Sequence, residues 1–250
     1  MFHVKPVSPT EDEIIAALME PLGVAGIETS PNQRSLLARH ARMVLEANST
    51  MNLTAIVQLD RVVELHIVDS LAFLRHVGVL EGEVVDIGSG AGYPGIPLAI
   101  MGLSVTMCES VRKKADFLER CVRELPVTAR VRPVRAEELA VEEPGLAEYV
   151  IARAVSALPS LVELSAPLLR IGGCLIALKG RPDQSEIAAG REAAAICGLR
   201  QCGIAEYALP AGEARTVVTY ERTDDPRVRL PRRPGMAQRS PLGGVPVPKR

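Results

Sequence analysis

The chain has 250 residues and a formal net charge of −1; 47% of its residues are hydrophobic and 24% are charged. This length and composition predict a packed soluble protein of one large domain, or of one domain with an added cap. No apolar run reaches the roughly 18 residues that span a bilayer, residues 1–9 lack the apolar core of a signal peptide, and the cysteines are scattered without CxxC spacing. We therefore expect a cytoplasmic protein with no disulfide framework, no metal site and no membrane partner.

The charge is unevenly distributed along the chain. Residues 222–250 contain eight Lys or Arg and two Asp, a net charge of +6, which leaves −7 for the remainder. A basic tail on an acidic body favours an anionic macromolecular partner. A solvated, disordered tail would have the same composition, so both interpretations stay open at this point.

Helical periodicity dominates the first part of the chain. Capping patterns at Thr10 and Ser30 predict helices over about 10–22 and 30–47. Apolar residues at helical spacing predict a third helix over about 59–77. This segment is expected to form a helical cap.

The third predicted helix carries a polar group of residues. His66, Asp69 and Ser70 are three and four residues apart and share one helix face. A functional contact is possible there, but a hydrogen bond on the helix surface is the commoner explanation for such a pair. The role of these residues stays open.

From Glu81 onward, short strands alternate with helices. The predicted strands are 83–87, 104–108, 128–134, 149–152, 174–178, 202–208 and 214–221. The predicted helices are 95–102, 111–125, 158–169 and 185–196. The last two strands are joined by a turn too short for a helix, so they should be antiparallel.

This alternation predicts a doubly wound, Rossmann-like α/β fold with a mostly parallel, seven-stranded sheet. We expect a helical cap at 1–80, packed as one unit with the sheet domain at 81–222. A basic Pro/Arg-rich tail at 223–250 should be irregular.

A glycine-rich loop follows the first predicted strand. Gly88, Gly90 and Gly92 come directly after Asp86 and before a helix. Glycine permits positive φ and close approach of a ligand, and a helix start offers free amides. A nucleotide-like cofactor binds at this position in a doubly wound sheet, and Glu109 at the end of the second strand can accept hydrogen bonds from ribose hydroxyls.

Two cofactors fit this loop. The spacing Gly90-x-Gly92-x-x-Gly95 matches the dinucleotide fingerprint, so an NAD-dependent oxidoreductase is one alternative. Asp86 would repel a pyrophosphate, but it suits the ammonium group of S-adenosylmethionine. The closing strand pair also leaves no second domain for hydride transfer. We therefore favour S-adenosylmethionine.

The other strand ends supply further candidate residues, because ligands bind beyond the carboxyl edge of such a sheet. Ser110 follows the second strand. Ala136 and Glu137 follow the third strand, beside an expected adenine, although Glu137 could equally be a helix cap or a surface acid. Arg153, after the fourth strand, would face the acceptor or the cofactor carboxylate unless it pairs with a nearby acid. Lys179 ends the fifth strand.

Two cations begin a predicted helix after the second strand. Arg112 and Lys113 lie in its first turn, where positive charge opposes the helix dipole. RNA phosphate would compensate for this, but solvated side chains fit equally well.

Several motifs occur in matching order between about residues 30 and 242. They are Met51-Asn52-Leu53-Thr54-Ala55, His66-Ile67-Val68-Asp69-Ser70-Leu71, the stretch from Val85 through Gly95 to Ala99, Arg153-Ala154, Ala177-Leu178-Lys179-Gly180, and Pro231-Arg232-Arg233-Pro234-Gly235 with Pro241-Leu242. Together they resemble the bacterial small-subunit ribosomal RNA guanine-N7 methyltransferase family, also called the glucose-inhibited division protein B family. Glu109 stands where that family usually has Asp, which keeps the charge.

The resemblance implies a class I S-adenosylmethionine-dependent methyltransferase that methylates N7 of a guanine in 16S ribosomal RNA, in a loop near the decoding region. The cofactor-binding candidates are Asp86, Gly88, Gly90, Tyr93, Glu109, Ser110, Ala136, Glu137 and Arg153. The RNA-binding candidates are Arg112, Lys113, Lys179, Arg232 and Arg233. Arg153 and Lys179 are the candidates for a catalytic role.

The residues present fit this acceptor. Guanine N7 already carries a lone pair, so alignment and exclusion of water are needed rather than a base. Methylation of an exocyclic amine is typically marked by an Asn-Pro-Pro-Tyr-like loop, where this chain has Ala152-Arg153-Ala154-Val155. A ribosome-binding factor that kept the fold but lost catalysis is the rival hypothesis. We expect a monomer whose partner is 16S ribosomal RNA or the small ribosomal subunit.

Overall fold

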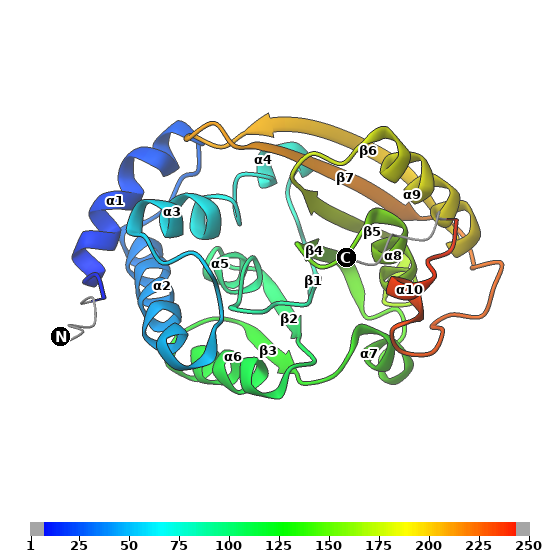
Figure 1. The fold of residues 1–250 in the computed structure, drawn as a ribbon, viewed down its shortest axis with the longest axis horizontal. Coiled ribbons are helices and arrows are strands. Elements are labelled where there is room, and N and C mark those ends of the chain that lie inside the picture. The colour runs from blue at the N-terminus through cyan, green and yellow to red at the C-terminus, as the bar shows by residue number, and fades with distance from the viewer. Residues whose placement is uncertain (1–7, 244–250) are drawn as a thin grey trace, which may run out of the picture.

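Seven strands form a single sheet in the computed structural model, which describes residues 8–243. Their order is β3-β2-β1-β4-β5-β7-β6 (Figure 1). The strands are β1 (Glu83–Ile87), β2 (Ser104–Cys108), β3 (Ala129–Arg132), β4 (Ala147–Arg153), β5 (Leu169–Lys179), β6 (Leu199–Ala208) and β7 (Ala214–Arg222). β1 to β5 are mutually parallel, whereas β7 is antiparallel to β5 and β6. The predicted doubly wound sheet with an antiparallel closing pair is confirmed.

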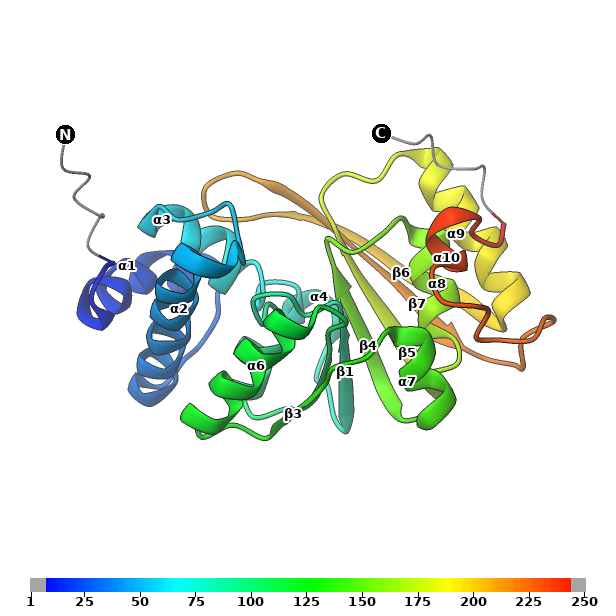
Figure 2. The same ribbon diagram turned by 60° about the horizontal axis from the view of Figure 1, so that its bottom comes forward.

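Helices cover both faces of the sheet. They are α1 (Glu11–Val24), α2 (Pro31–Met51), α3 (Leu59–Val62), the π-helical η1 (Val63–Val68), α4 (Leu74–Val77), α5 (Gly95–Ile100), α6 (Arg112–Glu124), α7 (Ala136–Glu142), α8 (Leu158–Ser165), α9 (Gln184–Cys197) and α10 (Met236–Arg239). Figure 2 shows α1, α2 and α3 gathered at one end of the molecule and α8, α9 and α10 at the other, with the sheet between them. None of these helices is long and apolar enough to cross a membrane.

The two cores follow from the alternation of side chains along each strand. Val84 and Ile151 pack with α1, α2, α5 and α6 on one face of the sheet. Their chain neighbours Val85 and Val150 pack with α7, α8 and α9 on the other face. β1 and β4, in the middle of the sheet, are therefore buried on both sides, as is typical of parallel strands.

The first two helices begin as their capping patterns predict. Thr10 Oγ1 accepts from the amide of Glu13 at 3.2 Å, and the Glu13 carboxylate accepts from the amide of Thr10 at 2.7 Å. Ser30 and Gln33 form the same reciprocal pair at 3.2 and 2.8 Å. These contacts satisfy amides that a helix start leaves free.

The prediction of one continuous helix over 59–77 is wrong. The segment consists of α3, the π-helical η1, a turn and α4. The amide of Asp69 donates to the carbonyl of Glu64 at 3.0 Å, a hydrogen bond that spans five residues instead of four. His66, Asp69 and Ser70 are buried, so the interpretation of a hydrogen bond on the helix surface is also wrong.

Other parts of the fold also differ from the prediction. α7 was not predicted, because its seven residues are too few to show a clear helical period. β5 begins at Leu169 and passes through Gly172 and Gly173, which the sequence placed between a helix and a strand. The described part of the tail, 223–243, includes the single turn α10 and packs against α8, so this part is not a disordered extension.

The β6–β7 hairpin connects the sheet to the helical cap. Its two strands run along one side of the molecule to the end where α1 lies (Figure 1). There the amide of Ala211 donates to Glu64 Oε1 at 2.7 Å. This contact holds η1 against the closing strands and places its residues beside the carboxyl edge of the sheet.

Candidate functional site

The glycine loop after β1 lies where the strand order reverses, between β1 and its two neighbours β2 and β4. Gly88, Gly90 and Gly92 have φ values of +70°, +58° and +93°. A Cβ on Gly88 would lie 2.9 Å from Val155, and one on Gly92 would lie 2.9 Å from Ile96. Backbone conformation and space therefore both require glycine here.

Asp86, near the end of β1, binds the first residue of α5 and so fixes both ends of the glycine loop. Its Oδ2 accepts from the amide of Gly95 at 3.1 Å, whereas its buried Oδ1 has no hydrogen-bond partner among the described residues. Burial raises the pKa of this carboxyl to about 6. A carboxylate already lies at the start of α5, where a dinucleotide would place its pyrophosphate, and this disfavours NAD.

Glu109 lies on the other side of the loop. Its carboxylate is buried and accepts from the amides of Gly90 at 3.0 Å and Val111 at 2.7 Å. Each carboxylate oxygen has a second lone pair, so both can still accept from ribose hydroxyls. Ser110 follows and is exposed.

A small cavity of about 90 Å³ opens beside the loop. We call it the β1–β3 cavity, because Gly88, Ser110 and Ala136 line it from the ends of these three strands. Glu137 also lines it, and its Oε1 accepts from the amide of Gly235 in the tail at 2.7 Å. The structure thus brings together four predicted cofactor-binding residues, and one of them also fixes the tail.

A second cavity, of about 320 Å³, lies at the carboxyl ends of β4 and β5. We call it the β4–β5 cavity. Arg153 and Lys179, predicted from the strand ends, line it together with His66, Asp69 and Arg215. Ala154 lines it as well and has a φ of +57°, a conformation that costs energy for a residue with a Cβ and is often found at functional sites.

The polar centre of the β4–β5 cavity is the Asp69 cluster, made of Asp69, Arg153 and Arg215. Arg215 donates to Asp69 Oδ1 at 2.7 Å and to Oδ2 at 3.1 Å, and Arg153 donates to Oδ2 at 3.1 Å and to the carbonyl of Leu65 at 2.9 Å. Their side chains are 8%, 15% and 19% exposed. Arg153 is therefore paired with an acid, the alternative that the sequence left open, but the pair lines a cavity.

Arg215 is a site residue that the sequence analysis missed. β7 is antiparallel to β5, and Thr216 is paired with Lys179. The first residues of β7 therefore lie at the same edge as the last residues of β5. The sequence analysis predicted only that β6 and β7 pair with each other, and the neighbouring position of β7 and β5 that brings Arg215 to Lys179 is seen only in the structure.

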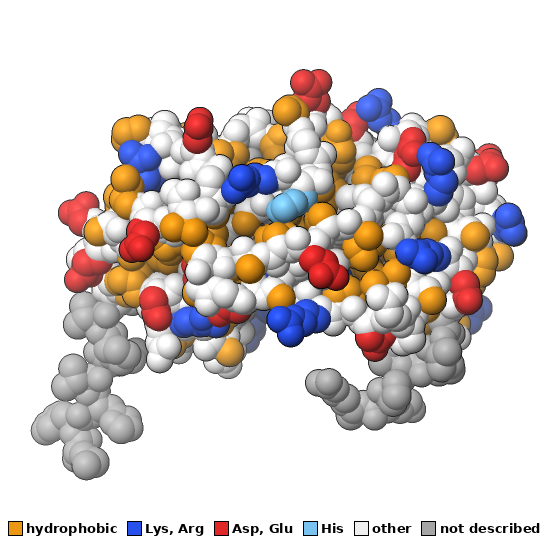
Figure 3. Space-filling view, turned by 90° about the horizontal axis from the view of Figure 1, so that it is seen from above, with side chains coloured by type: hydrophobic (Ala, Val, Ile, Leu, Met, Phe, Trp, Pro, Cys, Tyr) orange, Lys and Arg blue, Asp and Glu red, His pale blue; other side chains and the backbone are white. Residues whose placement is uncertain are grey.

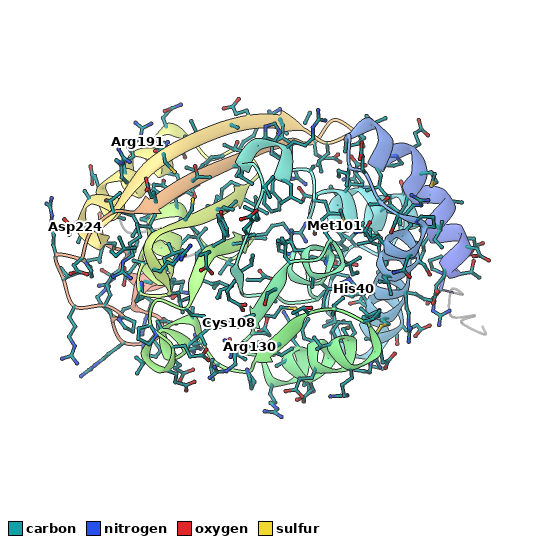
Figure 4. The ribbon with its side chains drawn as sticks, turned by 180° about the vertical axis from the view of Figure 1, so that it is seen from behind. His40, Met101, Cys108, Arg130, Arg191 and Asp224 are labelled. Atoms are coloured by element: carbon teal, nitrogen blue, oxygen red, sulfur yellow. The ribbon has the colours of Figure 1, made fainter. Side chains whose placement is uncertain are left out.

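Tyr93 of the glycine loop lies between two histidines. The ring of His66 stacks on it with a centroid distance of 4.7 Å, and the ring of His40 lies at 4.6 Å. Figure 4 labels His40, which comes from α2. His66 Nε2 is 2.9 Å from Thr54 Oγ1, and His40 Nε2 is 3.0 Å from the carbonyl of Ala91. Burial lowers the pKa of His40 to about 3 and that of His66 to about 4, so both rings are neutral near pH 7.

The predicted RNA-binding residues do not form one cluster. Arg112 and Lys113 are exposed at the start of α6, where Arg112 pairs with Asp116 at 2.9 Å. Lys179 donates to the carbonyl of Ser156 at 3.0 Å and to Glu186 at 2.8 Å.

The two tail arginines differ in their contacts. Arg232 donates to both oxygens of the buried Glu163, at 2.6 and 2.5 Å, so its charge is used within the protein. Arg233 is exposed and lines a hollow of about 920 Å³ between the tail and α7. Of the two, Arg233 is the one whose charge faces solvent.

Comparisons with known proteins converge on one family. A family model described as rRNA small subunit methyltransferase G matches residues 33–212. A ribosomal RNA small subunit methyltransferase G from Deinococcus radiodurans is 40% identical over 225 residues, covering 87% of this chain and 88% of the relative. One of the same name from Carboxydothermus hydrogenoformans is 38% identical over 224 residues, covering 87% and 95%.

A solved structure shares the fold. A geranyl diphosphate methyltransferase in complex with GPP and sinefungin aligns with a TM-score of 0.53 at 15% identity, covering 78% of this chain and all of that one. At this identity the likeness concerns the arrangement of strands and helices.

Proposed function

The chain belongs to the ribosomal RNA small subunit methyltransferase G family, and we propose that it transfers a methyl group from S-adenosylmethionine to N7 of a guanine in 16S ribosomal RNA. The relatives' names supply the class of reaction and the ribosomal RNA of the small subunit. The acceptor atom and the roles of individual residues are our proposal.

The observation that carries the proposal is the arrangement of the two cavities. Val155 lines the β1–β3 cavity, and its neighbours Arg153 and Ala154 line the β4–β5 cavity. A cofactor whose nucleoside lies in the β1–β3 cavity would therefore extend past Val155 toward the β4–β5 cavity. One ligand can connect the nucleoside site to the acceptor site across the glycine loop.

The residues of the first site fit S-adenosylmethionine. Glu109, which binds the Gly90 amide, would also accept from the ribose hydroxyls, and Gly88 would allow the backbone to approach the ligand. The buried Oδ1 of Asp86, which has no hydrogen-bond partner among residues 8–243, would provide a negative charge that favours the cofactor's ammonium group. When bound, the cofactor supplies a methyl group on a positively charged sulfur.

The residues of the second site would orient the base. Two of the three hydrogens of the Lys179 ammonium group are used, by Ser156 and Glu186, which leaves one donor for guanine O6. Arg153 uses Nη1 for Asp69 and Leu65, so its remaining donors can bind the cofactor carboxylate or the base. Holding O6 aims N7, its neighbour on the base edge, at the methyl carbon.

The geometry gives little support to a covalent route through cysteine. Cys108 is the cysteine that lines the β1–β3 cavity, and burial raises its pKa to about 12. It therefore stays a neutral thiol, whereas a nucleophilic cysteine requires the thiolate.

The test is a methylation assay on two substrates. The protein would be incubated with radiolabelled S-adenosylmethionine and unmethylated small-subunit RNA, either naked or in assembled subunits, and the RNA would then be cleaved at 7-methylguanine. We expect label in at least one substrate and cleavage at one guanine. Label without such cleavage would keep the reaction class and overturn the acceptor. No label in either substrate would favour the rival hypothesis of a non-catalytic ribosome-binding factor.

A further inference from the structure

One wall of the β1–β3 cavity belongs to the C-terminal tail. Gln238, in the single turn α10, lines this cavity together with Ala136, Glu137 and Val155. It is about a hundred residues from Glu137 along the chain. None of the motifs in the sequence points to it.

The tail is held in place on both sides of Gln238. Arg232 binds both oxygens of the buried Glu163, and the amide of Leu242 donates to Glu163 Oε2 at 3.2 Å. The amide of Gly235 donates to Glu137 Oε1 at 2.7 Å. Ala237, next to Gln238, is 2% exposed and packs into the core beneath. The position of Gln238 is therefore fixed by its neighbours.

The lining of the cavity fits the edge of an adenine. Much of it is apolar, from Ile87, Val134 and Leu164, which suits the faces of a flat ring. Adenine presents a donor at its N6 amino group and an acceptor at N1. An ionised Glu137 can accept hydrogen bonds but cannot donate them. Its carboxylate keeps lone pairs beyond the one that accepts from the Gly235 amide. Gln238 brings an amide, which can donate.

We propose that Gln238 binds the adenine of the cofactor, with its amide donating to N1 while Glu137 accepts from the N6 amino group. The C-terminal tail is then a part of the cofactor site and not only a surface for RNA. This inference rests on the proposed function, because it takes the cofactor to be S-adenosylmethionine.

The first measurement is the affinity for S-adenosylhomocysteine, the product that keeps the same adenosine, by titration calorimetry on the full chain. Gln238→Ala should weaken binding about five- to tenfold, the usual effect of losing one hydrogen bond. The matched control is Ser240→Ala, which removes an exposed hydroxyl just after α10 that makes no hydrogen bond among residues 8–243, and it should bind like the wild type. Equal affinities of the wild type and Gln238→Ala would overturn the proposal.

The second measurement identifies the atom. The 1-deaza analogue of S-adenosylhomocysteine has a C–H group in place of N1. The wild type should bind it about five- to tenfold more weakly than the natural product, whereas Gln238→Ala should bind both ligands alike, because the partner of N1 is already gone. If the variant discriminated between the two ligands as strongly as the wild type, Gln238 would not contact N1.

The same titrations separate this proposal from the proposed function. Binding of S-adenosylhomocysteine to the wild type, with no effect of Gln238→Ala, would overturn the role of Gln238 alone. No binding to the wild type at all would contradict the cofactor assignment, and this inference would fall with it.

Discussion

At the scale of single residues, the Asp69 cluster offers a sharp test. Asp69→Ala removes the carboxylate that both Arg153 and Arg215 bind and leaves two cations in a mostly buried site. Breaking a fully buried pair costs about 3–5 kcal/mol; since these arginines keep some access to water, we expect the free energy of unfolding to fall by about 2 kcal/mol. Urea denaturation would measure the loss.

The matched control for Asp69→Ala is Asp116→Ala. Asp116 also pairs with one arginine, Arg112, but both side chains are more than half exposed. Its removal should change stability by less than about 0.5 kcal/mol. Equal losses in the two variants would show that the Asp69 cluster is an ordinary surface pair.

Glu109 should act on the cofactor. Glu109→Ala removes the acceptor for ribose hydroxyls and the partner of the Gly90 amide, so we expect the dissociation constant for S-adenosylhomocysteine to rise at least about tenfold. Glu138→Ala is the control. Glu138 is an exposed acid whose carboxylate accepts from the amide of Arg135 at the start of α7. Unchanged affinity of Glu109→Ala would contradict its role, provided that its circular dichroism spectrum is that of the wild type.

The two buried histidines should make the protein less stable in acid. Their pKa values fall from 6.5 to about 3 in His40 and about 4 in His66, so between pH 4 and 6.5 the unfolded chain binds up to two more protons than the folded protein. Stability is therefore lost as the pH falls through this window. Asp86, whose pKa rises from 3.8 to about 6, opposes the loss over part of the window, since it is protonated in the folded protein.

The variant His40→Gln isolates one of these protons. We expect the dependence of unfolding free energy on pH to decrease by about 1.4 kcal/mol per pH unit between pH 4.5 and 6. Urea denaturation at several pH values, for the wild type and the variant, would measure this difference. Parallel curves for the two proteins would show that His40 titrates alike in the folded and unfolded states.

At the scale of elements, the docking of the tail gives different roles to Arg232 and Arg233, which the sequence analysis had both taken as RNA-binding candidates. Arg232→Ala leaves Glu163, which is 3% exposed, without its cation, so the tail should detach from α8. Faster amide hydrogen exchange over 231–243 would report this, with Arg233→Ala as the control that keeps the tail docked. Equal exchange in the two variants would contradict the structural role of Arg232.

Some features of the fold and of the site could be predicted from the sequence, and others could not. The glycine loop and the parallel strands were predictable, because glycine spacing and apolar periodicity are local signals. Arg215 and Gln238 reach the site only through β7 and the docking of the tail, so their role depends on contacts between distant segments. The π-helical turn of η1 was missed because an apolar stripe at helical spacing does not show one inserted residue.

At the scale of the whole molecule, we expect RNA binding to rely on local groups of cations. The face seen in Figure 3 carries Lys and Arg side chains interspersed with Asp and Glu, without a continuous basic band. Arg233 and Lys113 are exposed cations. Arg233 lies in the tail, two residues before the Gly235 that binds Glu137, and Lys113 lies at the start of α6, three residues after Ser110 of the β1–β3 cavity. Because the net charge is only −1, repulsion between protein and RNA is weak, and a few phosphate contacts can decide the affinity.

Arg233→Ala and Lys113→Ala should each weaken RNA binding and reduce the slope of log affinity against log salt by about 1. The affinity for S-adenosylhomocysteine should stay unchanged in both. Filter binding at several salt concentrations measures the slope, and Arg123→Ala, at the far end of α6, is the control. A slope identical to that of the wild type would remove the substituted residue from the RNA interface.

The π-helical turn of η1 has a consequence for how such a chain can evolve. It holds one residue more than an α-helical turn, and each residue rotates a helix by about 100°. Deleting a single residue from η1 would restore a regular helix and swing Asp69 away from Arg153 and Arg215, although no functional side chain had been removed. The number of residues in η1 is therefore constrained in the same way as the identity of Asp69. A related chain with one residue deleted here would have lost the Asp69 cluster.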